Sequence, residues 1–89
     1  MKAEDLRPGD IITWGVRDFA AVVDRIDNDD ELVYVMWAGF MKKGLAGAFD
    51  GLRHDVDSFS FDQIGYDLAL ARPLGGELFE VDQEAEELL

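Results

Sequence analysis

The sequence predicts a small, mainly β domain. Its clearest feature is a pair of apolar runs, 19–26 and 32–37, that are rich in β-branched and aromatic residues. Such residues fit a pleated, half-buried surface, so both runs favour strands over helices. Polar and apolar residues also alternate over 55–61, which is typical of a strand with one buried face. At 89 residues, the chain is long enough for one domain.

The two apolar runs predict a β-hairpin over 19–37. The stretch between them, 27–31, reads Asp-Asn-Asp-Asp-Glu. Asp and Asn stabilise turns because their side chains accept hydrogen bonds from nearby backbone groups. The second run is apolar on both faces, which favours a central strand over an edge strand. We expect this hairpin to serve as scaffold, with its turn adding negative charge.

The residues on either side of the hairpin predict further short elements. Upstream, the turn 6–10 contains a Pro-Gly pair and leads into an apolar run at 11–14. Downstream, 61–65 is typical of a single helical turn, and 66–71 predicts a final strand that ends at Pro73. The sequence pattern therefore predicts a three-stranded meander, followed by a fourth strand, a helical turn and a last strand.

This order of elements resembles an SH3-like small β-barrel, the fold of KOW, Tudor and many bacteriophage accessory domains. The residues that carry the resemblance are the opening LRPGDII, the compact meander after it and the helical turn before the last strand. The resemblance implies a five-stranded antiparallel barrel over 1–73, followed by an acidic C-terminal segment over 74–89. It implies no functional residue, because this fold hosts many unrelated functions.

Residues 38–53 form an insertion that is too long for a hairpin between the third and fourth strands. Met41, Leu45 and Phe49 recur at helical spacing. Glycines interrupt the same stretch, and each glycine destabilises a helix by about 1 kcal/mol relative to alanine. The pattern leaves two alternatives open, a short helix docked on the barrel or a loop that orders on a partner.

The acidic C-terminal segment also has two interpretations. Leu78, Val81 and Ala85 suit one stripe of a helix. The stretch 78–81 by itself suits an added edge strand. Residues beyond Asp82 are expected to fray, as chain termini often do.

Composition limits the classes of function. Twenty acidic and eight basic residues give a net charge of −12, which argues against direct binding to nucleic acid or to anionic membranes. The chain has no cysteine, which excludes thiolate sites and disulfides and fits a reducing cytoplasm. No apolar run approaches the ~20 residues that span a bilayer. We expect a cytoplasmic protein, in a host cell if it is viral, with a basic protein as its partner.

The titratable residues do not form a recognisable catalytic or metal site. His54 is the only histidine and lies beside Asp55, but no nucleophile accompanies this pair. The acids of 27–31 have the oxygen ligands that hard cations prefer. A calcium loop needs a glycine at its sixth position, where this chain has Leu32. We therefore predict no enzyme activity, no metal and no cofactor.

Aromatic residues offer a different kind of candidate site. Trp14, Tyr34, Trp37 and Phe40 have the character of an aromatic cage, which attracts cations to the faces of its rings. Alternation within the hairpin makes several of them core residues instead.

The sequence therefore favours a non-catalytic protein-binding domain. Its acidity favours a phage-encoded inhibitor that mimics nucleic acid and blocks a host nucleic-acid-binding enzyme. The alternative is a structural or assembly subunit that associates, as a homo-oligomer or in a complex, through the apolar face of 40–52. The candidate partner-binding residues are Asp27, Asp29, Asp30, Glu31, Phe40, Leu45, Phe49, Asp55, Asp57, Glu80 and Glu84.

Overall fold

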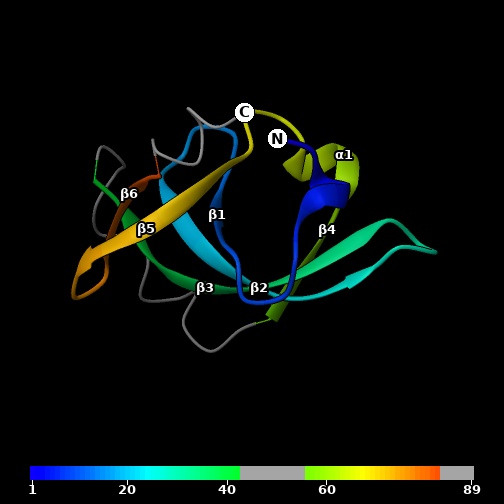
Figure 1. The fold of residues 1–89 in the computed structure, drawn as a ribbon, viewed down its shortest axis with the longest axis horizontal. Coiled ribbons are helices and arrows are strands. Elements are labelled where there is room, and N and C mark those ends of the chain that lie inside the picture. The colour runs from blue at the N-terminus through cyan, green and yellow to red at the C-terminus, as the bar shows by residue number, and fades with distance from the viewer. Residues whose placement is uncertain (43–55, 83–89) are drawn as a thin grey trace.

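The computed structural model describes residues 1–42 and 56–82, and this part of the chain is mainly β. Figure 1 shows its elements coloured along the chain. In chain order they are η1 (Ala3–Asp5), β1 (Ile11–Thr13), β2 (Phe19–Asp27), β3 (Leu32–Met41), β4 (Val56–Ser60), α1 (Phe61–Ile64), β5 (Ala69–Gly75) and β6 (Leu78–Val81).

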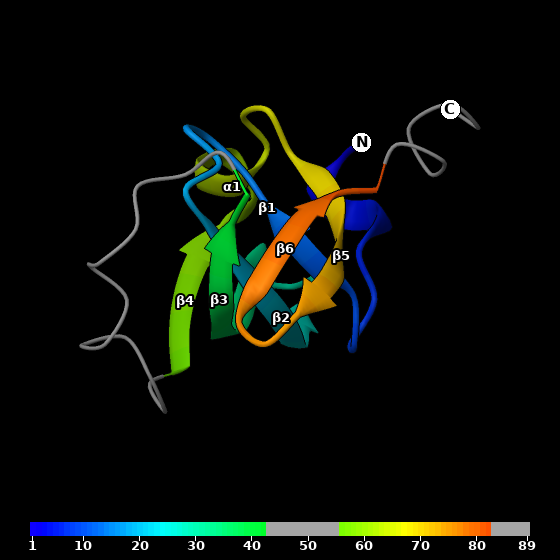
Figure 2. The same cartoon turned by 90° about the vertical axis from the view of Figure 1, so that its left-hand side faces the viewer.

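Five of the six strands form a closed ring of hydrogen-bonded neighbours. β1 pairs with β2 and β5, β5 pairs with β6, β6 pairs with β3, and β3 pairs with β2. All of these pairings are antiparallel except the one between β3 and β6, which is parallel. β4 lies outside the ring, and β3 is its one neighbour among the described strands (Figure 2).

The sheet thus differs from the predicted five-stranded antiparallel arrangement, because it has a sixth strand and is mixed. The difference lies in β6. Gly75 and Gly76 adopt φ values of 134° and 59°, which glycine tolerates best, and they reverse the chain tightly after β5. β6 then pairs with β5 and reaches β3 at Phe40 and Met41. The stretch 78–81 is a strand, as one of the two alternatives predicted, but it lies between two strands instead of at an edge.

Two strands extend past their predicted ends. β3 continues to Met41, so the first residues of the expected insertion, 38–41, are strand. The choice between a docked helix and a loop falls on residues outside the described part of the chain. β5 runs through Pro73, which is exposed and paired with Phe79. Proline has no backbone N–H, so a strand tolerates it at positions where no N–H has to donate to a neighbouring strand.

The predicted hairpin and helical turn are confirmed, and local hydrogen bonds explain both. In the turn between β2 and β3, the Asp27 carboxylate accepts bonds from the backbone N–H groups of Asp29 and Asp30, at 3.0 and 3.1 Å. At the start of α1, Ser60 and Gln63 form a capping box in which each side chain accepts a bond from the other residue's backbone N–H.

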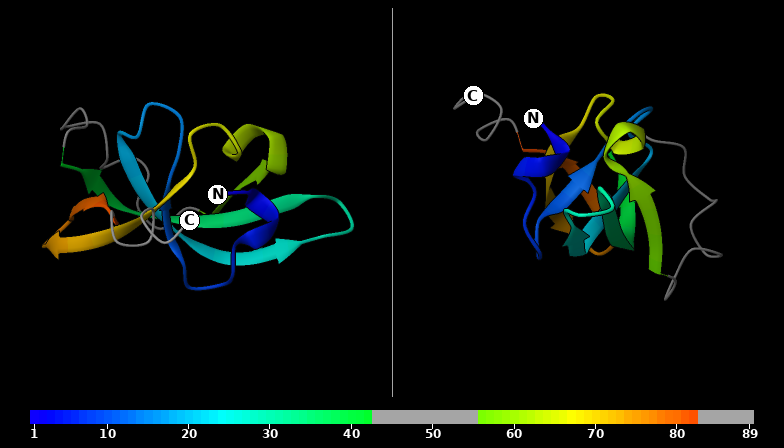
Figure 3. Two further views of the ribbon diagram at one scale, coloured as in Figure 1. Left: turned by 45° about the horizontal axis from the view of Figure 1, so that its top comes forward. Right: turned by 90° about the vertical axis from the view of Figure 1, so that its right-hand side faces the viewer.

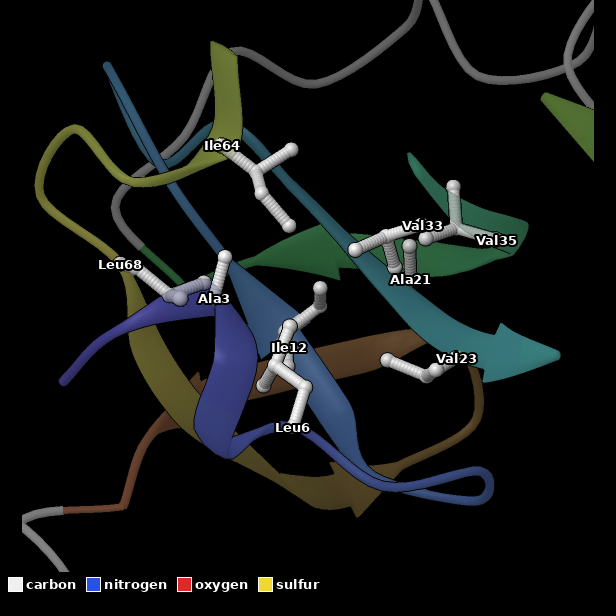
Figure 4. Packing of buried hydrophobic residues seen from close by; sticks show 9 residues of the cluster. All are labelled: Ala3, Leu6, Ile12, Ala21, Val23, Val33, Val35, Ile64 and Leu68. Carbon is white, nitrogen blue, oxygen red and sulfur yellow. The ribbon is translucent and has the colours of Figure 1, made fainter. Parts of the chain in front are cut away.

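The main core lies between the strands of the ring and the two short helical elements (Figure 4). Full burial of one aliphatic side chain contributes about 1.5–3 kcal/mol, so this cluster is the main stabilising feature. Its members are Ala3, Leu6, Ile12, Ala21, Val23, Val33, Val35, Ile64 and Leu68. A second cluster, beneath β5 and β6, contains Ala20, Met41, Ala71 and Phe79.

Candidate functional site

An open hollow lined by aromatic side chains lies next to the main core. Its volume is about 370 Å³, within the range of about 300–1,000 Å³ that is usual for ligand sites. The β1–β2 connection, β2, β3 and β4 all contribute to it. We call it the aromatic hollow, and its lining residues are Trp14, Val16, Asp18, Phe19, Trp37 and Phe59.

Three of the lining rings contact one another. The ring centroids of Trp14 and Trp37 are 5.7 Å apart and their planes are stacked at 29°. Phe59 meets both indoles edge-on, at 5.1 Å from Trp14 and 6.1 Å from Trp37. Aromatic pairs at such distances contribute about 0.5–1.5 kcal/mol beyond their burial. The three rings therefore hold one another in place while they remain half-buried.

Strand periodicity brings Trp37 and β4 to the same side of the sheet. Side chains two residues apart on a strand share a face, so Trp37 follows Val33 and Val35 inward. On β4, Phe59 and Asp57 stand opposite Val33 and Val35 and share that face. The Trp37 Nε1–H donates a hydrogen bond to the Asp57 carboxylate at 2.5 Å. This bond fixes the orientation of the indole at the edge of the aromatic hollow.

The β1–β2 connection is fixed to the connection between α1 and β5. Arg17 donates from Nη2 to the Asp67 carboxylate at 3.0 Å and from Nε to the Asp67 carbonyl at 3.1 Å. The Gly15 N–H donates to the Tyr66 carbonyl at 2.9 Å. The side chains of Val16 and Tyr66 are left in solvent, 85% and 74% exposed. The two connections are thus fixed to each other while the side chains of Val16 and Tyr66 remain exposed. The Val16 side chain lies at the aromatic hollow.

The predicted aromatic cage is only partly brought together. Trp14 and Trp37 meet, and Phe40 lies 6.1 Å from Phe19 between ring centroids. Tyr34 faces the other side of β3, where the Arg25 guanidinium lies 3.9 Å above its ring.

Sequence reasoning missed Phe19 and Phe59 as site residues. Phe59 had a usable signal, because the alternation over 55–61 places it on the same face as Asp57. Phe19 carried no such signal, because its neighbours across the sheet depend on how β2 and β3 align.

The predicted partner-binding acids occupy separate parts of the structure. Asp29, Asp30 and Glu31 are exposed at the tip of the β2–β3 hairpin, which projects away from β5 and β6 (Figure 1, and Figure 3, left). Asp57 lies beside the aromatic hollow, and Glu80 accepts a hydrogen bond from Arg72 Nε at 2.8 Å on the β5–β6 pair. Asp27 is engaged in its own turn. Leu45, Phe49, Asp55 and Glu84 lie outside the described residues.

Two general features of the described residues bear on function. Over 1–42 and 56–82, no group of three or more His, Cys, Asp or Glu side chains is placed to hold a metal ion. Within the same ranges, no helix has the length and apolarity to cross a membrane. His54 lies outside these ranges.

Comparisons of the chain with protein-family models, with curated proteins and with solved structures find no match. The aromatic hollow and its surroundings therefore carry the functional inference by themselves.

Proposed function

We propose that this chain is a non-catalytic protein-binding domain whose docking surface is the aromatic hollow. The observation that carries the proposal is the set of half-buried rings of Trp14, Trp37 and Phe59 at an open hollow, beside the exposed Val16. Tryptophan and other aromatic residues dominate the binding energy of many interfaces.

We further propose that the ring of strands is an SH3-like barrel with one added strand. Three features support this assignment. The strands β1 to β4 follow one another as a meander, α1 stands between β4 and β5, and β5 returns to pair with β1. β6 is then an addition to that arrangement.

The partner is a protein with a basic surface. The chain has a net charge of −12, and the aromatic hollow includes Asp18 and borders Asp57. The electric field of these negative charges attracts a basic protein over long range and raises its association rate. Added salt screens this attraction. The rings supply contact area, whereas the carboxylates guide the approach.

A pair of surface variants tests this proposal. Val16→Lys places a positive charge at the aromatic hollow, where it repels a basic partner, whereas Leu74→Lys places the same charge on β5, away from it. Both native side chains are exposed, so both variants are expected to fold. With a partner recovered on the wild-type chain as bait, we expect Val16→Lys to weaken binding at least about tenfold, or about 1.4 kcal/mol. Leu74→Lys should bind nearly like wild type, and equal binding by both variants would contradict the proposal.

A second candidate function is inhibition of a nucleic-acid-binding enzyme by mimicry of phosphates. The exposed carboxylates of Asp29, Asp30 and Glu31 at the projecting hairpin tip favour it. Exposed carboxylates gathered at one place present negative charge to a basic groove, as the phosphates of a nucleic acid do. The size and acidity of the chain suit a phage-encoded inhibitor of this type.

The two candidates predict different sensitivities. Mimicry predicts that DNA competes for the partner and that the triple change Asp29→Asn, Asp30→Asn and Glu31→Gln abolishes binding. Docking through the aromatic hollow predicts that the triple variant retains binding within about threefold, because only long-range attraction is reduced. An equilibrium competition assay at two salt concentrations distinguishes them.

A further inference from the structure

β4 is the one strand of the described sheet that has a single neighbour. Every strand of the ring is paired on both sides, and β3 has three partners. The edge of β4 that faces away from β3 therefore presents backbone N–H and C=O groups that no described strand pairs. Such an edge is a template for the addition of another strand. Figure 2 shows β4 at the margin of the sheet.

The two faces beside this edge differ in chemistry. On one face, Asp57 and Phe59 stand next to Trp37 and the aromatic hollow. On the other face, Val56 and its cross-strand partner Met36 are 53% and 44% exposed. A strand placed against β4 would send alternate side chains to these two faces. One set of side chains would contact the face with Asp57 and Phe59. The other set would contact the face with Val56 and Met36.

We propose that β4 receives an extended segment of a basic partner protein, which adds to the sheet as a further strand and places a cationic side chain beside Asp57. This inference rests on the proposed function and specifies how the partner engages. Alternate residues of the segment are apolar and cover Val56 and Met36.

Charge decides which occupant fits the edge. A second copy of this chain would bring together two molecules of net charge −12, which repel each other. A cationic side chain gains from the Asp57 carboxylate, which lies beside the half-buried rings of Trp37 and Phe59. Arginine suits this position better than lysine, because its planar guanidinium stacks on rings while it hydrogen-bonds to a carboxylate.

The length of β4 sets the length of the segment. β4 spans five residues, so a partner segment of about five residues is enough to pair with it. Main-chain hydrogen bonds along the edge supply affinity for any extended segment, and the side-chain positions supply specificity.

Nuclear magnetic resonance of the ¹⁵N-labelled full chain tests the proposal with a short probe. The probe is a capped peptide of alternating valine and arginine, about five residues long. One control peptide has glutamate in place of arginine, and the other has all of its backbone nitrogens methylated. Two readouts are followed, the amide exchange rates of β4 and the indole N–H signal of Trp37.

The arginine peptide is expected to shift the Trp37 indole signal and to slow exchange of the outward amides of β4 at least about tenfold. The glutamate peptide should bind at least about tenfold more weakly, and the peptide with methylated backbone nitrogens should give no protection. Asp57→Asn should reduce the preference for arginine over glutamate, because only the long-range attraction of the acidic chain remains, while its amide oxygen still accepts the Trp37 bond. Val56→Ser removes apolar surface at a half-exposed position without adding a charge, and it should weaken binding of the arginine peptide independently.

Failure of this inference is distinguishable from failure of the proposed function. A shift of the Trp37 indole without protection of β4 would overturn strand addition and leave docking at the aromatic hollow standing. A second outcome would also overturn the proposal. If sedimentation shows a dimer without peptide and the β4 amides are protected in that dimer, the strand that pairs with β4 belongs to a second copy of the chain. The absence of both responses at millimolar peptide would also overturn the proposal, and the comparison of Val16→Lys with Leu74→Lys would then test the proposed function by itself.

Discussion

The two halves of β3 pair with different strands, one of which is itself paired further and one of which is not. Near its C-terminal end, Phe40 and Met41 pair with β6, which is itself paired with β5, so the sheet closes there. Its N-terminal half pairs with β4, and no described strand continues the sheet beyond β4. β3 thus has a closed side, where β6 pairs near its C-terminal end, and an open side, where β4 pairs with its N-terminal half; Figure 2 shows β4 and β6 next to β3.

Packing follows the same division. On the closed side, Phe79 is 7% exposed and the backbone of Gly39 lies against β6. On the open side, Trp37 and Phe59 are half-buried and Val56 is 53% exposed. The closed side stabilises the fold, and the open side keeps apolar surface available. Substitutions on each side should therefore affect different properties.

Phe79→Ala should have the largest effect on stability. The ring is buried with Met41 and Ala71, and its removal should lower the free energy of unfolding by about 3 kcal/mol. Phe59→Ala, on the half-buried ring of the open side, should lower it by about 1–2 kcal/mol and should weaken partner binding more. Urea denaturation measures both values, and equal losses would break the distinction between the two sides.

Gly39→Ala should have the next largest effect. A Cβ at this position would lie 2.1 Å from the Glu77 carbonyl oxygen and 2.8 Å from Phe79 Cε2, so the strands must move apart. Overpacking of this kind costs about 2 kcal/mol. Gly76→Ala is the matched control, because it has open space and a φ of 59° and should cost about 1 kcal/mol. A larger loss for the control than for Gly39→Ala would contradict close packing between β3 and β6.

Trp37→Phe should lower stability by about 1 kcal/mol. The change keeps a ring but removes the Nε1–H that donates to Asp57. In an Asp57→Ala background the same change should have a smaller effect, because the bond is already absent and only ring contacts are lost. Thermal unfolding of the four variants of this cycle measures the coupling. If the losses of stability in the two single variants add up in the double variant, the bond between Trp37 and Asp57 does not stabilise the indole.

Arg72→Ala should have the smallest effect. Arg72 and Glu80 form an ion pair on the outer surface of β5 and β6, and the Arg72 side chain is 53% exposed. Exposed pairs contribute little, so we expect a change within about 0.5 kcal/mol, which decreases further in high salt. A loss as large as that of Gly39→Ala would mean that side-chain charge, not backbone packing, holds β6 in place.

Local features of this fold could be predicted from the sequence, and long-range pairings could not. The turn at Asp27 and the cap formed by Ser60 and Gln63 depend on residues within three positions of one another. The pairing of β3 with β6 joins segments far apart in sequence, and the four residues of β6 carry little pattern.

The aromatic hollow was harder to predict for the same reason. Its rings come from β2, β3, β4 and the β1–β2 connection, and they meet only because the sheet fixes the alignment of these strands. A register shift between Ala20 and Ala21 changes the partners of β3 near Trp37. Sequence patterns indicate which residues share a strand face, but they do not indicate such a shift.

Amide hydrogen exchange of the free chain tests the contrast between the two sides of β3 most directly. Amides of β6 lie between two strands and should exchange only through large openings of the sheet. Amides of β4 that point away from β3 should exchange by local fluctuation, faster by on the order of 100-fold. Equal protection of the two sets would contradict the open edge, and with it the assignment of this side of the molecule to partner binding.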